Sequence, residues 1–160
     1  MRRVVPRDLR AAEGIHTWNR YAPPLAGYAE EVYLLELIGD ESGATQTLLK
    51  NASDDRGVSV HLNTRQLPCY TLWKNTTAEP DGYVTGLEPG TNFPNPRSFE
   101  GQRGRVVKLA PGAVAAFDLS LEFHRDSAAV REAEETISAL RGLDKPEISE
   151  QPQSDWCVIG

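Results

Sequence analysis

Seven short strand-like runs, with turn signals between them and no helical segment, occupy residues 28 to 123 of this chain. In the clearest run, Val58, Val60 and Leu62 alternate with glycine or polar neighbours, which is the two-residue period of a half-buried strand. Short strands at this spacing favour antiparallel sheets packed face to face, so we expect an all-β, antiparallel β-sandwich. The seven runs are 28–37, 45–50, 57–62, 67–73, 83–87, 105–109 and 113–123.

One segment near the C-terminus has helical periodicity. Between residues 127 and 141 the apolar residues Val130, Ala133, Ile137 and Leu140 fall on one stripe, and Gly142 is placed to end the helix. We expect the first residues, which are rich in arginine, to be solvated, and the Pro/Glu/Gln/Ser-rich end to be flexible. The predicted organisation is an N-terminal extension (1–27), the sandwich with a sugar cleft (28–124), the C-terminal helix (125–145) and a flexible tail (146–160).

Composition excludes several classes of partner. The chain has 160 residues and a formal charge of -6, so no global field attracts nucleic acid or an anionic membrane surface. No stretch approaches the ~20 apolar residues of a membrane span, and the first residues lack the apolar run of a signal peptide. We therefore expect a cytoplasmic protein. Two cysteines cannot build a metal site or a disulfide framework, and Cys69, in an apolar run, is expected to be a buried thiol.

A carboxylate followed by a stiff loop interrupts the pattern of strands and turns. Glu88 closes an apolar run, and the loop after it contains three prolines and two asparagines before Arg97. Each proline fixes its φ angle, so such a loop can hold an acid/base group at the mouth of a β-fold. The plainer interpretation is a solvated glutamate at a strand end, followed by an ordinary turn.

The sequence of residues 86–95, Gly-Leu-Glu-Pro-Gly-Thr-Asn-Phe-Pro-Asn, resembles the loop that carries the catalytic glutamate of aldose 1-epimerases. These are galactose-mutarotase-like proteins, and the similarity is closer still to an uncharacterised bacterial branch of the superfamily. The motifs Trp-Lys-Asn at 73–75 and Asp-Gly-Tyr at 81–83 also fit this branch. The resemblance covers roughly residues 18–124 and corresponds to the C-terminal half of such proteins.

This resemblance implies a partial mutarotase-type sandwich with a small carbohydrate bound in a cleft, and no cofactor or metal. The implied reaction interconverts sugar anomers by acid/base ring opening, with Glu88 as the base. The family's acid is a histidine upstream of the glutamate, and His16, His61 and His124 do not sit in a matching motif. Because family members are about twice as long, we expect a truncated or half-length member. It would act as an isomerase, or else as a non-catalytic carbohydrate-binding module or an inactive remnant. A homo-oligomer or a complementing N-terminal half is the expected protein partner.

Five further residues are candidates for binding the sugar. The Trp73 indole can stack on a sugar ring or pack in the core, and Lys74, with the opposite facing on the strand, can donate to a hydroxyl or be solvated. Asn75, Asn92 and Asn95 are either hydroxyl-binding residues or turn formers. We expect Glu88 to line a polar cleft with Trp73, Lys74 and one of Asn92 or Asn95.

Overall fold

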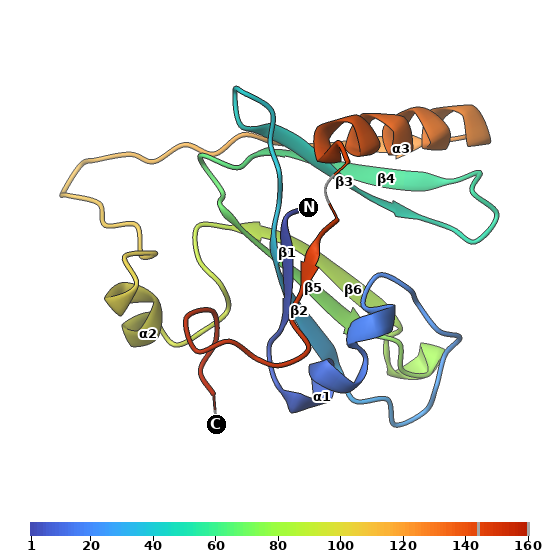
Figure 1. Cartoon of the computed structure of the whole chain (residues 1–160), viewed down its shortest axis with the longest axis horizontal. Coiled ribbons are helices and arrows are strands. Elements are labelled where there is room, and N and C mark those ends of the chain that lie inside the picture. The colour runs from blue at the N-terminus through green and yellow to red at the C-terminus, as the bar shows by residue number, and fades with distance from the viewer. Residues whose placement is uncertain (144, 160) are drawn as a thin grey trace.

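Two β-sheets packed face to face form the body of the protein in the computed structural model, which describes residues 1–143 and 145–159 (Figure 1). All neighbouring strands are antiparallel except β1 and β8. This confirms the predicted antiparallel-rich β-sandwich. The five-stranded sheet has the order β6 (Val84–Gly90), β5 (Cys69–Asn75), β2 (Glu31–Glu36), β1 (Arg3–Pro6) and β8 (Glu147–Ile148), and the three-stranded sheet has the order β3 (Ala44–Lys50), β4 (Gly57–Asn63) and β7 (Leu119–His124).

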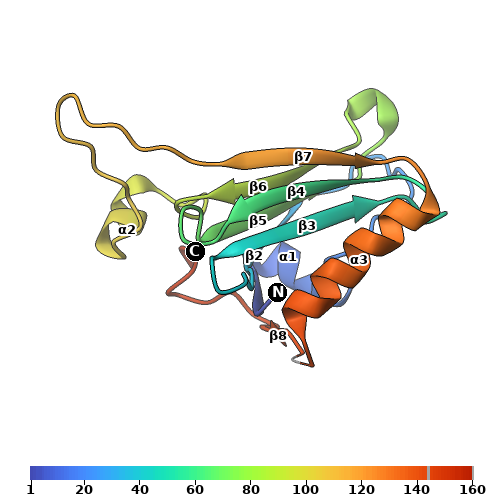
Figure 2. The same ribbon diagram turned by 90° about the horizontal axis from the view of Figure 1, so that it is seen from above.

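The predicted C-terminal helix is α3 (Ser127–Arg141), which lies along β3 on the outer face of the three-stranded sheet (Figure 2). Its first turn is capped by the Asp126 carboxylate, which accepts hydrogen bonds from two backbone N–H groups. Gly142 ends it with a positive φ of 62°, a conformation that favours glycine. Four short helices lie in the connections: α1 (Leu9–Glu13), η1 (Ile15–Thr17), η2 (Glu79–Asp81) and α2 (Arg97–Gln102).

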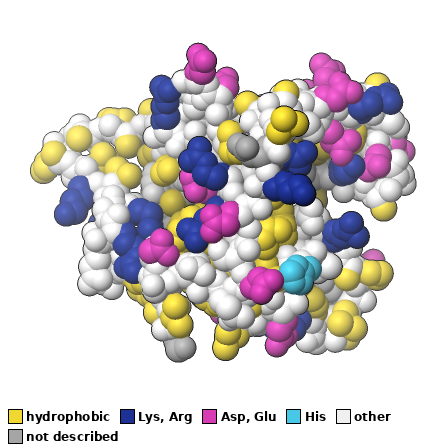
Figure 3. All heavy atoms as spheres, in the orientation of Figure 1, with side chains coloured by type: hydrophobic (Ala, Val, Ile, Leu, Met, Phe, Trp, Pro, Cys, Tyr) yellow, Lys and Arg dark blue, Asp and Glu magenta, His cyan; other side chains and the backbone are white. Residues whose placement is uncertain are grey.

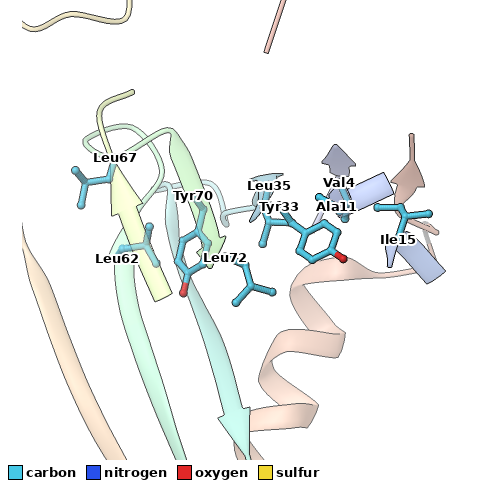
Figure 4. Close-up of a cluster of buried hydrophobic side chains, with 9 residues drawn as sticks. All are labelled: Val4, Ala11, Ile15, Tyr33, Leu35, Leu62, Leu67, Tyr70 and Leu72. Carbon is cyan, nitrogen blue, oxygen red and sulfur yellow. The ribbon is translucent and has the colours of Figure 1, made fainter. Parts of the chain in front are cut away.

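The main core lies between the two sheets (Figure 4). Tyr33 is fully buried there, and the hydroxyl of buried Tyr70 makes a 2.7 Å hydrogen bond with Thr47 across the sheets. Such a bond removes the cost of burying a phenol oxygen. The cluster consists of Val4, Ala11, Ile15, Tyr33, Leu35, Leu62, Leu67, Tyr70 and Leu72.

A second apolar cluster covers the opposite face of the five-stranded sheet. It contains Val5, Val32, Leu34, Cys69, Phe93 and Cys157. As predicted, Cys69 is a buried free thiol, and burial raises its pKa to about 11. The rings of Phe93 and Trp156 stack with centroids 4.9 Å apart, so the C-terminal segment packs on this face.

Both chain ends differ from the expectation. Residues 3–6 were expected to be solvated, but they form β1 between β2 and β8, and Val4 and Val5 are fully buried. Two adjacent valines can cover both faces of a strand, and neighbours on both sides complete its hydrogen bonds. The tail was expected to be flexible, but β8 and the segment up to Cys157 are docked. The predicted ranges 125–145 and 146–160 include residues 144 and 160, which lie outside the described residues.

The segment 104–118 also differs from the expectation. Runs 105–109 and 113–123 were predicted as strands, but only 119–124 forms one. Residues 104–118 form an extended loop that leaves the body of the molecule after α2 and returns at β7 (Figures 1 and 2). A strand-like pattern becomes a strand only when a neighbouring strand pairs with its backbone groups, and the described residues place none beside this loop.

Candidate functional site

Trp73 and Glu88 lie on the same face of the five-stranded sheet. In the β5–β6 register, Thr71 is opposite Glu88 and Trp73 is opposite Gly86, and directly opposed residues share a face. This is the outer face, which faces away from the three-stranded sheet. Because β5 and β6 are neighbours, two residues that are 15 positions apart in sequence lie on adjacent strands.

Gly86 makes room for the Glu88 carboxylate at the position directly opposite Trp73. A Cβ atom added to Gly86 would lie 2.2 Å from Glu88 Oε1, so the carboxylate folds back over the glycine. Gly86 is directly opposite Trp73, so the carboxylate lies at the same register position as the tryptophan. The Glu88 side chain is exposed. The arrangement places an exposed proton acceptor and a half-buried indole on the same face of the sheet.

A second carboxylate orients the tryptophan. Trp73 Nε1 donates a 2.7 Å hydrogen bond to Glu30 Oε2. Glu30 lies directly before β2, the strand next to β5, and this places it within reach of the indole. Sequence reasoning missed Glu30, because only the β2–β5 register brings it to Trp73. Asn75 follows Trp73 by two residues on β5 and shares its face.

Lys74 does not join this group, contrary to the prediction of one shared cleft. It points to the opposite face and is 3% exposed; its ammonium lies 3.5 Å from Glu31 Oε2 and donates to the Thr17 carbonyl at 3.1 Å. Burial lowers the pKa of Lys74, and the nearby Glu31 offsets part of that effect. Tyr33 donates a 2.8 Å bond to the same carboxylate. Lys74 therefore anchors the N-terminal segment to the sheet.

The side chains of the two loop asparagines form hydrogen bonds within the protein. Asn92 donates to the Phe93 carbonyl at 2.7 Å. Asn95 donates to Glu100 Oε1 at 2.7 Å and to the Trp156 carbonyl at 2.8 Å, and its own oxygen accepts from Val158 N at 3.3 Å. The Asn95 side chain thus fastens the loop to the C-terminal segment.

The buried carboxylate of Glu100 organises the loop that follows Glu88. Glu100 is 1% exposed and accepts two hydrogen bonds from the Arg105 guanidinium, at 2.6 and 2.7 Å. Burial alone would raise the pKa of Glu100, but the bonds from Arg105 and Asn95 outweigh it and hold that pKa below its usual range. Arg105 also donates to the Asp155 carbonyl at 3.1 Å. Sequence reasoning missed Glu100, because nothing local marks it as buried.

A cavity of about 260 Å³ lies beside this loop, but Glu88 does not line it. Asn92 and Asn95 line this cavity and Trp73 does not, and Lys74 is buried on the opposite face of the sheet, so one cleft does not unite all of these residues. Its lining residues are Thr91, Asn92, Asn95, Arg97, Glu100, Val106 and Val107.

Histidine is not found with Glu88 on this face. His61 lies on the three-stranded sheet, 3.0 Å from Glu122 Oε2, and His124 is buried on the same sheet against Ser59. His16 is exposed in η1. The described residues contain no group of His, Cys, Asp and Glu that could hold a metal ion, and no described helix is both long and apolar enough to span a bilayer.

The fold matches the β-sandwich of an aldose 1-epimerase-like protein. The crystal structure of "a putative aldose 1-epimerase from Klebsiella pneumoniae" superimposes with a TM-score of 0.89 and 39% sequence identity, over 93% of this chain. The match covers 39% of the Klebsiella chain, so this chain spans well under half of that protein. No curated protein matches the sequence.

The chain belongs to the family described as "Domain of unknown function (DUF4432)", whose model matches residues 1–123. The similarity thus begins at the first residue and not near Trp18, as the motifs alone had indicated. This agrees with the structure, in which β1 is an integral strand of the five-stranded sheet.

Proposed function

We propose that this chain binds a small carbohydrate on the outer face of the five-stranded sheet and that Glu88 is the general base of an aldose 1-epimerase-like reaction. One observation carries the proposal: the exposed Glu88 carboxylate folds over Gly86, which is directly opposite Trp73 on the same face of the sheet. The similarity in sequence and fold to the Klebsiella protein supports the same class of reaction.

The proposed chemistry needs one proton acceptor and one proton donor. Glu88 takes the proton from the hydroxyl on the anomeric carbon, while an acid protonates the ring oxygen and the ring C–O bond breaks. Rotation of the resulting carbonyl group and reversal of these steps give the other anomer. The Trp73 indole offers its electron-rich face to the C–H groups of the ring, and Asn75 on the same face can bind a hydroxyl. The donor to the ring oxygen must be a group outside the Glu88–Trp73 pair.

The test combines sugar binding with anomer exchange. Ligand-observed NMR would measure the binding of aldoses, and polarimetry or exchange NMR would measure anomerisation above the spontaneous rate. We expect Glu88→Gln to keep binding and to abolish conversion, because the amide is nearly isosteric but cannot take the proton. We expect Trp73→Ala to weaken binding roughly fivefold, the equivalent of about 1 kcal/mol.

Glu122→Gln is the matched control, because Glu122 is an exposed carboxylate on the three-stranded sheet. It should leave both binding and conversion unchanged. Full conversion by the Glu88→Gln variant would show that the base is a different group.

The second candidate function is carbohydrate binding without catalysis. It is favoured by the positions of His61 and His124, both on the three-stranded sheet, which leave Glu88 without a neighbouring histidine as acid. A wild-type chain that binds aldoses through Trp73 but does not accelerate anomerisation would establish this alternative.

A further inference from the structure

Strand β7 has one open edge. The three-stranded sheet has the order β3-β4-β7, so β4 pairs with one edge of β7, and no other described strand pairs with the opposite edge. Figure 2 shows β7 at one side of this sheet and α3 beside β3 at the other. The strand is six residues long and contains neither proline nor lysine, the residues that commonly protect edge strands from pairing.

The open strand also carries an apolar stripe. Leu119, Leu121 and Phe123 are 53%, 65% and 71% exposed, whereas Leu62 and Val60, opposite the first two on β4, are each 5% exposed. The same sheet face is therefore buried at β4 and open at β7. Hydrophobic side chains also gather on the loop that leads into β7, at the left of Figure 3. An exposed apolar stripe at a free strand edge marks an interaction site.

We propose that β7 pairs antiparallel with β7 of a second copy of this chain. The two-fold axis lies midway between the two Leu121 residues, and we call this the register with Leu121 on the axis. The pairing joins two three-stranded sheets into one six-stranded sheet. Leu121 of each copy lies opposite its counterpart, and Leu119 lies opposite Phe123. Both apolar stripes then meet on one face, as a self-complementary interface of two-fold symmetry requires.

The charges of β7 select this register. With Leu121 on the axis, Ser120 lies opposite Glu122, so a hydroxyl can donate to each carboxylate. With Ser120 on the axis, Glu122 would face Asp118 of the other copy, and with Glu122 on the axis, it would face itself. Directly opposed like charges destabilise a strand pair. The register centred on Leu121 pairs residues 119–123 of both strands, keeps the apolar stripe on one face and opposes no like charges, and this complementarity is the reason to assign a second copy as the occupant.

The position of Leu121 on the axis allows a charge-pairing test by light scattering or sedimentation equilibrium. We expect the wild-type chain to be a dimer. Leu121→Lys and Leu121→Glu should each be monomeric, with a dissociation constant raised more than about tenfold, because each variant opposes two like charges at the axis. An equimolar mixture of the two variants should form a heterodimer, since the lysine of one then faces the glutamate of the other.

Two further variants keep the test independent of folding effects. Leu9→Lys places the same charge on a leucine that is 70% exposed in α1, and should leave the dimer intact. Leu121→Cys should give a covalent dimer under mild oxidation, because directly opposed residues of an antiparallel pair lie within disulfide reach. Cys69 and Cys157 are buried and should not compete.

A wild-type chain that is monomeric at every concentration would overturn the proposal and leave the stripe to a different polypeptide. A dimer that survives Leu121→Lys, or two folded monomeric variants whose mixture stays monomeric, would also overturn the β7 pairing.

Discussion

Gly86 shapes the candidate site because it has no side chain. Glycine in a strand interior weakens the strand, because it has no side chain to pack and loses more backbone entropy on folding. Here the missing Cβ lets the Glu88 carboxylate lie over the strand, beside the residue that faces Trp73. A feature that is unfavourable for the strand therefore shapes the candidate site.

Replacement of Gly86 by alanine should separate stability from function. The three atoms nearest to the new methyl group all belong to the flexible Glu88 side chain, so we expect the free energy of unfolding to change by less than about 0.5 kcal/mol. The carboxylate would have to move, and conversion or binding of the sugar should fall. Urea unfolding and NMR binding would measure the two effects. Gly101→Ala is the control, since its Cβ would meet nothing closer than 4.0 Å; equal sugar binding by both variants would count against the site.

Lys74 should matter for stability and not for sugar binding. Lys74→Met leaves buried Glu31 with the partly exposed Arg10 guanidinium, 3.5 Å away, as its remaining cationic neighbour, and we expect a loss of about 3 kcal/mol in the free energy of unfolding. The double variant Lys74→Met/Glu31→Gln should recover part of that loss, because it removes the buried charge of the Glu31 carboxylate. Urea unfolding would test both variants. A Lys74→Met chain with native stability but impaired sugar binding would restore Lys74 to the site.

At the scale of elements, hydrogen bonds and an aromatic stack join the loop after β6 to the C-terminal segment. Asn95 and Arg105 bind backbone carbonyls of the C-terminal segment, and Phe93 stacks on Trp156. Arg3 adds a cation over the Trp156 ring, 5.3 Å from its centroid. The proline-stiffened loop is thus fixed by the C-terminal segment, which Arg3 from the N-terminal strand contacts in turn.

Removal of the Trp156 ring should release this contact. We expect Trp156→Ala to lower the free energy of unfolding by about 2 kcal/mol, less than for a fully buried tryptophan, and to speed hydrogen exchange in residues 149–158. Trp18→Ala removes another half-buried tryptophan, which packs against the core between the sheets. The Trp18→Ala control should lower the free energy of unfolding but should not speed hydrogen exchange specifically in residues 149–158. Unchanged exchange in the Trp156 variant would mean that other contacts hold the segment.

At the scale of the whole molecule, acid should unfold the chain through Glu100. Its pKa is lower in the folded state than its usual value of 4.5, so its contribution to stability is present above that value and is lost as pH falls through the folded pKa. The free energy of unfolding should therefore fall as the pH drops below about 4.5. Asp40, in an exposed turn, has a pKa shifted in the same direction.

Urea unfolding at neutral pH and at a series of acidic pH values would measure how the free energy of unfolding depends on pH. The Glu100→Gln variant should be less stable at neutral pH by about 2 kcal/mol, because a buried charged hydrogen bond is lost. It should also show a weaker dependence on pH than the wild type. Parallel pH profiles for the two proteins would place the acid sensitivity elsewhere.

Local sequence patterns predicted the elements whose own residues specify them. The alternation of Val58, Val60 and Leu62 gave β4, and the apolar stripe with Gly142 gave the bounds of α3. The same reasoning predicted strands at 105–109 and 113–118 that do not form, because a strand also needs a paired neighbour. Periodicity describes which faces a segment can bury, and it does not tell which segment lies beside it.

The sequence by itself determined the sandwich class, the buried thiol of Cys69 and the C-terminal helix, because these depend on periodicity and on neighbouring residues in the chain. Only the tertiary structure decided that residues 3–6 are an internal strand, that Lys74 points away from Trp73 into an ion pair with Glu31, and that Glu30 reaches the indole. Each of these follows from strand order and register, which bring together residues far apart in sequence, and a shift of one residue would move every side chain of a strand to the other face.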